Sequence, residues 1–370
     1  MRPRFSACVA ALAIALAGCE SPTTPPPLPK VNGWQEIAPP AAGVRIVALA
    51  NVGDRLMALG SVPGPDGRAP AAWTTTDGHG WRPVALHPVT GYGEQAEFTR
   101  FAVLGDRILV WGMAFGGAHS NPRPTSWAGD AERLTEYEQP MERFGGPHAV
   151  GQYDEAGVPG TGVIVGQWDK PHGGYGAAVW TSPDGATWTR GPDDPVLSGA
   201  HEQTSAEGVS AQGNGFLIVG NAIGDTDGVM HATAWSSPDG KHHRRLTVPD
   251  AAGAEAVKVA CAGTGCAIVG ARTKGRRQTV CWPVHGPAIG RPTAGPTGDT
   301  LDVLQVLVSG KTSVLLRVDG GTRLFALNGC LDWRADPLPV TTRDARLGVL
   351  PGGTELLATT DEHGSRLWTR

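Results

Sequence analysis

One stretch decides the fold: GVIVGQWDKPHGGYGAAVWTSPDGATWTR, residues 162–190. An apolar run ending in glycine is followed by a loop, a second apolar run containing Trp180, the turn Ser-Pro-Asp-Gly and a short outer run. Asp-Gly between two strand-like runs indicates a tight hairpin, because glycine accepts a positive φ and aspartate can bond its own backbone. The stretch therefore predicts three consecutive strands of an antiparallel sheet.

The same pattern returns along the chain at intervals of 54, 53, 55, 47, 43 and 43 residues. A fixed period of this size indicates stacked supersecondary units, and units made only of strands are typical of a β-propeller with one sheet per repeat. We therefore predict an all-β fold, a seven-bladed β-propeller of four-stranded antiparallel blades. The aromatic residues at the matching point of the repeats are Trp73, Trp127, Trp180, Trp235, Trp282, Phe325 and Trp368.

The last repeat is incomplete, since the chain stops just after its third strand. Residues 32–37, Asn-Gly-Trp-Gln-Glu-Ile, are similar to the outer-strand segment 185–190 of the third repeat. A strand from the N-terminal side would complete the last blade and cover an edge that otherwise templates aggregation. We predict this closure and a propeller spanning residues 32–370. The alternative is that residues 32–37 only end a linker.

The beginning of the chain carries targeting signals. A basic start precedes an apolar segment, residues 7–16, that is too short to cross a bilayer as a helix, so residues 1–18 are predicted to be a signal peptide. The sequence LAGC at residues 16–19 resembles the lipobox of bacterial lipoproteins. The resemblance implies cleavage before Cys19 and acylation of that residue, with palmitate or a similar chain. The alternative is an ordinary signal peptide with an incidental cysteine.

The segment after the lipidation site, residues 19–31, is proline-rich and predicts an extended spacer. Several acyl chains on one residue anchor stably, so we expect the propeller at the extracytoplasmic face of a membrane. Removal of Arg2 and Arg4 with the signal peptide leaves 29 basic against 35 acidic residues, a net charge of −6. No basic run stands out, which argues against a nucleic-acid partner. We also expect a monomer that requires no cofactor.

The turn sequence Ser-Pro-Asp-Gly-Ala-Thr-Trp of the third repeat has looser copies at residues 75–81 and 237–243. It resembles the Asp-box, or BNR repeat, of sialidase-like propellers, although this chain lacks one glycine of the usual box. The resemblance covers the period of most of the body but the box itself in three repeats. It implies that the box residues are structural, serving folding and not catalysis. These residues are Asp77, Trp81, Asp184, Trp188 and Asp239.

Four cysteines remain after the signal and the lipidation site, and an exported setting permits disulfides. Cys261 and Cys266 flank a four-residue turn, which places them opposite each other in a hairpin, close enough to bridge. Cys281 and Cys330 belong to adjacent blades and would pair by elimination, although four cysteines allow three connectivities. A metal site is the alternative, but no histidine lies at ligand spacing, so no metal is predicted.

The resemblance also implies an enzymatic alternative, a divergent sialidase-like glycosidase. That family binds the substrate carboxylate with three arginines, the first in an Arg-Ile-Pro motif, and uses a Tyr–Glu nucleophile and an Asp acid/base. Val47 replaces the proline of the motif, the three arginines do not share one register, and no tyrosine lies in the last two repeats. The matching positions here are Arg45, Arg100 and Arg346 for the carboxylate and Asp66 for the acid/base.

The favoured hypothesis is therefore a binding protein with no catalytic residues. Long loops at residues 112–125, 167–176 and 221–230 connect second to third strands, and such loops gather on one face of a propeller. We expect a non-catalytic, membrane-tethered propeller that binds a glycan, a peptide or an envelope protein through that face. The alternatives are the glycosidase and an assembly scaffold for a membrane complex.

Overall fold

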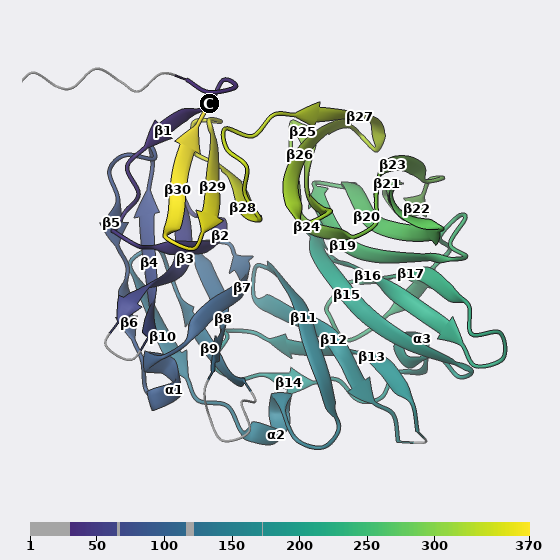
Figure 1. Ribbon diagram of the computed structural model, residues 1–370. Coiled ribbons are helices and arrows are strands. Elements are labelled where there is room, and N and C mark those ends of the chain that lie inside the picture. The colour runs from purple at the N-terminus through teal and green to yellow at the C-terminus, as the bar shows by residue number, and fades with distance from the viewer. Residues whose placement is uncertain (1–29, 65–66, 116–121, 172) are drawn as a thin grey trace, which may run out of the picture.

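The computed structural model describes residues 30–64, 67–115, 122–171 and 173–370. Seven sheets stand as blades around a central axis, and the four main strands of each blade are antiparallel and run outward from it in succession (Figure 1). The predicted seven-bladed β-propeller is confirmed. The predicted signal peptide and Cys19 lie outside the described residues. None of the helices in the described ranges is long and apolar enough to cross a membrane.

The first three blades follow the chain in order. Blade one contains β2 (Arg45–Val52), β3 (Arg55–Gly64), β4 (Gly67–Thr75) and β5 (Arg82–Pro83). Blade two contains β7 (Glu97–Leu104), β8 (Arg107–Ala114), β9 (Arg123–Gly129) and β10 (Arg133–Tyr137). Blade three contains β11 (Ala149–Val158), β12 (Thr161–Asp169), β13 (Tyr175–Ser182) and β14 (Thr189–Arg190).

The remaining blades repeat this order, and only the last takes a strand from elsewhere. Blade four contains β15 (Glu202–Gln212), β16 (Gly215–Gly224), β17 (Met230–Ser237) and β18 (Arg244–Leu246). Blade five contains β19 (Ala254–Ala262), β20 (Gly265–Lys274), β21 (Arg276–His285) and β22 (Ala288–Ile289). Blade six contains β24 (Leu301–Ser309), β25 (Lys311–Val318), β26 (Gly321–Asn328) and β27 (Leu331–Asp336). Blade seven contains β28 (Asp344–Val349), β29 (Glu355–Asp361), β30 (Gly364–Thr369) and β1 (Gln35–Ile37).

Two blades carry a fifth strand that the four-stranded pattern does not predict. Strand β6 (Ala85–His87) runs parallel to β10 outside blade two, and β23 (Thr293–Gly298) pairs with β21 beside β22. Both follow an outer strand of only two residues. Pro83 ends the first of these and cannot donate to a ladder, so the chain moves on to the next free edge.

The repeated aromatic residue occupies one register in all seven blades, on the third strand opposite the middle of the second. All seven are buried at the interface between blades, which explains why the repeat keeps a large side chain there. Ala58, Val110, Ile164, Ile218, Ile268, Val314 and Leu357 face Trp73, Trp127, Trp180, Trp235, Trp282, Phe325 and Trp368 respectively.

The glycine that ends the apolar run of the second strand lies opposite a β-bulge in the first strand. A Cβ at Gly166 would lie 2.0 Å from the carbonyl oxygen of Gly151, and one at Gly220 would lie 1.8 Å from that of Ser205. The bulge recurs at this point in blades one to six, where one residue of the first strand is unpaired. Bulging brings the first strand close to the second, so only glycine fits in most blades.

The predicted closure is confirmed, since β1 pairs antiparallel with β30 and completes blade seven. Trp34, just before β1, is fully buried, and the Arg370 guanidinium lies 4.1 Å from the centroid of its ring. The Glu36 carboxylate accepts two hydrogen bonds from Arg366, at 2.8 and 2.7 Å. Figure 1 shows the start of the described chain beside its C-terminus.

Both predicted cysteine pairs form disulfides. Cys261 and Cys266 face each other across the hairpin of β19 and β20, with Cα atoms 4.0 Å apart. Cys281 and Cys330 join blades five and six, with Cα atoms 5.4 Å apart. The second bridge is the longer-range one, closing 49 residues, and it ties together two neighbouring sheets that share one apolar cluster.

The three box-like turns share one hydrogen-bond pattern. The carboxylate of Asp77 accepts from the backbone N–H of His79 and of Gly80, each at 2.8 Å, and these bonds lower the pKa of Asp77 to about 2. Asp184 and Asp239 accept in the same way from the two residues that follow their glycine. Ser182 and Ser237 close the turn from the other side. These aspartates therefore hold turns.

Candidate functional site

The two ends of the propeller are built from different connections. One end, the loop face, carries the hairpins between second and third strands and the connections between blades, with the short helices α1 (Gly91–Glu94), α2 (Met141–Phe144) and α3 (Pro195–Ser198). The other end, the turn face, carries the tight turns between first and second and between third and fourth strands. Because Gln35 pairs with Thr369 at the end of β30, the chain enters the propeller at the turn face.

Two of the three arginines matched to the sialidase pattern connect neighbouring blades. Arg346 of β28 donates to the carbonyl of Val47 in blade one at 2.7 Å and also binds Asp344. Arg100 of β7 donates to the carbonyl of Tyr153 in blade three at 2.9 Å. The two arginines occupy equivalent registers in their blades. Each pairs with the second-strand residue next to the one that faces the repeated aromatic. Both guanidinium groups therefore hold adjacent first strands together.

The third arginine and the acid/base candidate lie elsewhere. Arg45 begins β2 two positions further toward the loop face, so it does not share the register of the other two. Burial, and then the positive charge of Arg45, lower the pKa of the neighbouring Arg68. Asp66 lies outside the described residues. The structure therefore does not place the three arginines in one register.

A different cluster lies around the axis between blades two and five, and sequence reasoning missed it. Tyr153 and Glu207 are the unpaired bulge residues of blades three and four. Burial and then the negative charge of Glu207 raise the pKa of the Tyr153 hydroxyl, and the positive charge of Arg100 lowers it. Lys258 of blade five reaches the carboxylate of Asp154 in blade three at 3.1 Å, past Gly208, which has no side chain. No sequence signal marks these positions, because a bulge is defined by the pairing of two strands.

Two carboxylates in this region are held away from water. Burial raises the pKa of Glu207, against hydrogen bonds from Ser205 and Asn221 that lower it. Burial also raises the pKa of Glu155 to about 8, partly offset by the positive charge of Arg100. Among the described residues neither Oε2 of Glu155 nor Nη1 of Arg100 has a hydrogen-bond partner. The cluster therefore contains a carboxyl group that keeps its proton to a higher pH than an ordinary carboxyl group.

Glu155→Gln is expected to stabilise the protein increasingly as the pH rises from 5 to 9. The folded state binds the proton of Glu155 more tightly than the unfolded chain, so the contribution of Glu155 is fully present below about pH 4 and is lost as the pH rises through about 8. Urea unfolding at pH 5, 7 and 9 measures the difference. The exposed Glu138→Gln is the control, and parallel pH profiles for wild type and Glu155→Gln would contradict the assignment.

A groove with a volume of about 1270 Å³ lies on the loop face between blades two and three. Aromatic rings, methionines and prolines form much of its wall. The first residues of β11 also line the groove, directly before Tyr153 of the cluster around the axis. Two carboxylates and one guanidinium line the groove, those of Glu136, Glu138 and Arg123. Glu136 is occupied, because it accepts hydrogen bonds from the backbone of Val89 and Thr90. The groove therefore presents mainly apolar surface. Its ring- and sulfur-bearing walls are Tyr92, Met113, Tyr137, Met141 and Phe144.

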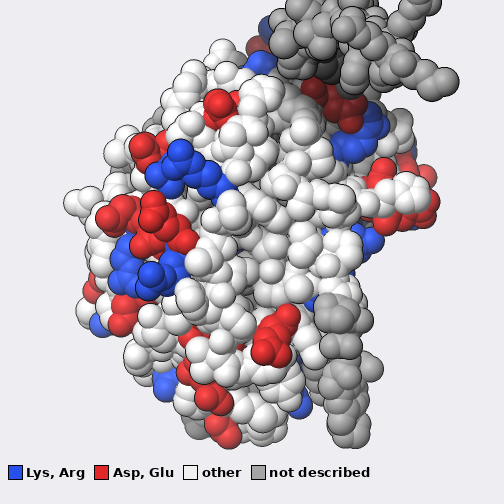
Figure 2. Space-filling view, turned by 90° about the vertical axis from the view of Figure 1, so that its left-hand side faces the viewer, with Lys and Arg blue, Asp and Glu red and all other residues white. Residues whose placement is uncertain are grey.

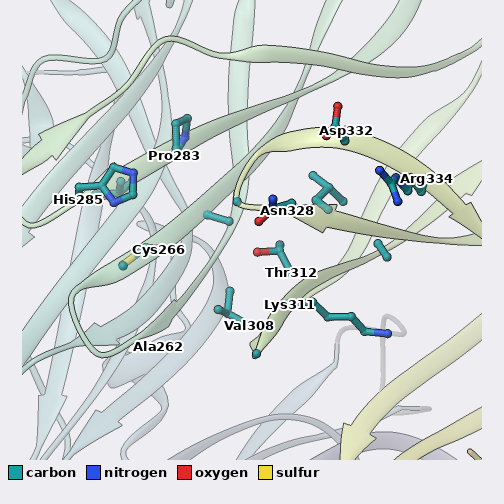
Figure 3. Close-up of a pocket in the computed structure, with 17 residues that line it drawn as sticks. Ala262, Cys266, Pro283, His285, Val308, Lys311, Thr312, Asn328, Asp332 and Arg334 are labelled. Carbon is teal, nitrogen blue, oxygen red and sulfur yellow. The ribbon is translucent and has the colours of Figure 1, made fainter.

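A second pocket, of about 530 Å³, opens on the turn face between blades five and six. Figure 3 shows His285 and Cys266 on one side and Asn328, Asp332 and Arg334 on the other. Lys311 at its edge is already bound to Glu355 at 3.0 Å. Around the side of the propeller seen in Figure 2, basic and acidic groups are interspersed between wide uncharged areas.

Within the described residues no group of three or more His, Cys, Asp or Glu side chains is placed to hold a metal ion. No family model matches the sequence. No curated protein matches it either.

Solved structures do resemble the fold. The β-propeller domain of the Trilobed protease from Pyrococcus furiosus, described as having an open velcro topology, superposes with a TM-score of 0.50 at 10% identity, over 88% of this chain and 93% of that one. Pyrococcus horikoshii acylaminoacyl peptidase gives 0.51 at 10% identity, over 88% of this chain and 51% of that one. A mutant Trypanosoma rangeli sialidase gives 0.44 at 10% identity, over 88% and 54%. At such identities the similarity extends to the propeller fold alone.

Proposed function

We propose that this protein is a non-catalytic binding module that recognises a peptide or protein segment through its loop face. The observation that carries the proposal is the placement of exposed apolar side chains. Ten large hydrophobic residues are exposed among the described residues, and eight of them lie on the loop face of blades two to four. Such clustering marks interaction surfaces, whereas scattered single residues do not. The eight are Val89, Tyr92, Phe115, Met141, Val150, Tyr175, Val196 and Val229.

The groove between blades two and three gives this surface a shape. Tyr92, Met141 and Val150 are exposed at its edges, and the buried ring of Phe144 forms part of its wall. Apolar anchors seated in a pocket carry most of the affinity of protein interfaces. A glycan would need convergent polar groups, but Glu136 of this groove is already satisfied by backbone donors. A peptide with apolar side chains therefore fits better than a sugar.

The placement of the arginines favours binding over glycoside hydrolysis. The guanidinium group of Arg346 is bound to Asp344 and two carbonyl groups, and Arg100 is held against the backbone of blade three. Substrate carboxylates need convergent, available guanidinium donors. The fold adds nothing to the enzymatic hypothesis, because one propeller fold hosts many functions.

Membrane tethering through Cys19 forms part of the proposal. The chain enters the propeller at the turn face, so an anchor joined to residue 30 would direct the loop face away from the membrane. A surface with exposed apolar groups would then be available to partners instead of lying against lipid. An assembly scaffold for a membrane complex would use the same surface and differ only in its partner.

Met141→Asp is expected to weaken peptide binding about tenfold or more, because it places a charge at the edge of the groove. The measurement selects peptides from a random display library against the purified protein and follows their affinity by fluorescence anisotropy. Leu331→Asp is the matched control, since Leu331 is 57% exposed on the turn face and Met141 is 59% exposed on the loop face. Equal affinities for both variants, or a glycan array with specific ligands and no selected peptide, would contradict the proposal.

A further inference from the structure

A cavity of about 650 Å³ lies on the outer flank of the propeller between blades three and four. Its walls come from β12, β13 and β14 of blade three, from α3, and from the turn that follows β17 of blade four. Trp168, Val179 and Leu197 supply apolar surface, and His243 lies at the blade-four side. This cavity is separate from the loop-face groove, with which it shares no lining residue.

The internal repeat explains why there is space here. The turn Ser-Pro-Asp-Gly-Ala-Thr-Trp of blade three ends in Trp188, and the matching turn of blade four ends in His243. Trp188 is buried against blade two, and its indole N–H donates to the hydroxyl of Ser126 at 2.9 Å. Blade four thus has an imidazole where blade three has an indole that fills the junction with the preceding blade.

One ring nitrogen of His243 has a hydrogen-bond partner, and the other has none among the described residues. Its Nδ1 lies 2.8 Å from one carboxylate oxygen of Asp194, and the other oxygen of Asp194 accepts from the backbone N–H of Val196 at 2.9 Å. The side chain of His243 is only 4% exposed, and its Nε2 is buried with no hydrogen-bond partner in the described structure. The position that corresponds to Ser126 in the preceding blade is Val179, which has no hydroxyl to offer.

Since a carboxylate accepts from Nδ1–H, the neutral imidazole has its acceptor lone pair on Nε2. A buried acceptor without a partner is costly, and a ligand that supplies a donor removes that cost. The cavity volume is within the usual range of small-molecule sites, which combine an apolar wall with a few placed polar groups. Here Asp169, Arg190, Asp193 and Lys241 line the cavity besides Asp194 and His243.

We propose that this cavity binds a small planar aromatic molecule that carries an N–H or O–H donor, of the indole or phenol class. The aromatic ring occupies space between the turn of blade four and the wall of blade three. The donor of the ligand bonds Nε2 of His243, as the indole of Trp188 bonds Ser126 one blade earlier. Val179 and Leu197 contact the ring, and Arg190, whose guanidinium lies 4.7 Å from the centroid of the Trp168 ring, borders it. Asp194 keeps the imidazole in the accepting tautomer.

The test titrates 5-fluoroindole into the full-length protein and follows the ligand by ¹⁹F NMR. We expect saturable binding, and about tenfold weaker binding to His243→Phe, which keeps a ring but removes the acceptor. Benzofuran, which has the shape of indole but no donor, should compete about tenfold less well than indole. His363→Phe is the control, because the side chain of His363 is 86% exposed in blade seven and does not line the cavity.

A second variant tests the origin of the cavity. His243→Trp restores the residue of the other turns, so it should abolish 5-fluoroindole binding and raise the unfolding midpoint. His243→Phe keeps the test decisive if the tryptophan variant does not fold. The proposal is overturned by an absence of saturable binding to wild type, by equal affinity of wild type and His243→Phe, or by equal competition from benzofuran and indole.

Discussion

Deletion of residues 32–38, with the preceding linker kept, is expected to lower the unfolding midpoint by roughly 5–10 °C and to promote aggregation. The deletion removes two buried apolar side chains, Trp34 and Ile37, each of which contributes about 1.5–3 kcal/mol when buried. It also removes the ladder between β1 and β30 and the paired hydrogen bonds of Glu36 with Arg366. Strand β30 then becomes an uncovered edge, and such edges pair with other chains.

Differential scanning calorimetry with light scattering measures both effects. A deletion of equal length inside the linker, residues 22–28, is the control and should leave the melting curve unchanged. Glu36→Ala separates the ion pair from the strand, and its effect should be small because the pair is partly exposed. If the deletion of residues 32–38 melts like wild type, the N-terminal strand contributes nothing to closure.

The parts of the fold that could be predicted are those that every repeat must satisfy. An aromatic side chain is needed at the same register of each blade, so its period revealed seven units. Glycine is needed opposite the bulge, so the apolar run of the second strand ends in Gly60, Gly112, Gly166, Gly220 and Gly270. Blades six and seven lack this glycine, and their strands were correspondingly harder to delimit from sequence.

The extra strands β6 and β23 could not be predicted, because their position depends on which edge is free after a two-residue outer strand. The bulges could not be seen either, since an unpaired residue is defined by its partner strand and not by its own identity. Tyr153 and Glu207 were consequently missed as neighbours. They lie about one repeat apart in sequence, and only the shared bulge brings them together with Arg100 around the axis.

The cavity at His243 shows the opposite case, in which a deviation from the repeat is informative. The repeat alone shows that the turn of blade four ends in His243, where the matching turn of blade three ends in Trp188. The role of His243 depends on Asp194, which lies 49 residues away in sequence, directly before α3. The carboxylate of Asp194 contacts the imidazole of His243. A sequence pattern identifies such a position, but the partner that gives it chemistry is set by how one blade packs on the next.

Cys19→Ala is expected to abolish metabolic fatty-acid labelling of the protein and to leave it unprocessed or released from the membrane. The thiol is the proposed attachment point of the acyl chains, and alanine keeps the size of a small residue while removing that atom. Several acyl chains on one residue anchor stably. Loss of the thiol should therefore remove both the label and the association with membranes.

Cys8→Ala is the matched control, because Cys8 lies in the same N-terminal segment but is proposed to leave with the signal peptide. Labelling should persist in that variant. Fatty-acid label that survives in Cys19→Ala would place the lipid elsewhere and overturn the tethering proposal.

The orientation of the propeller relative to the membrane gives an independent readout. With the anchor joined on the turn-face side, a protease-accessible tag inserted after Val229, on the loop face, should be cleaved more readily in intact envelopes than one inserted after Gly329. In Cys19→Ala protein that is released from the membrane, the two tags should be cleaved equally, because nothing then holds the turn face against the membrane.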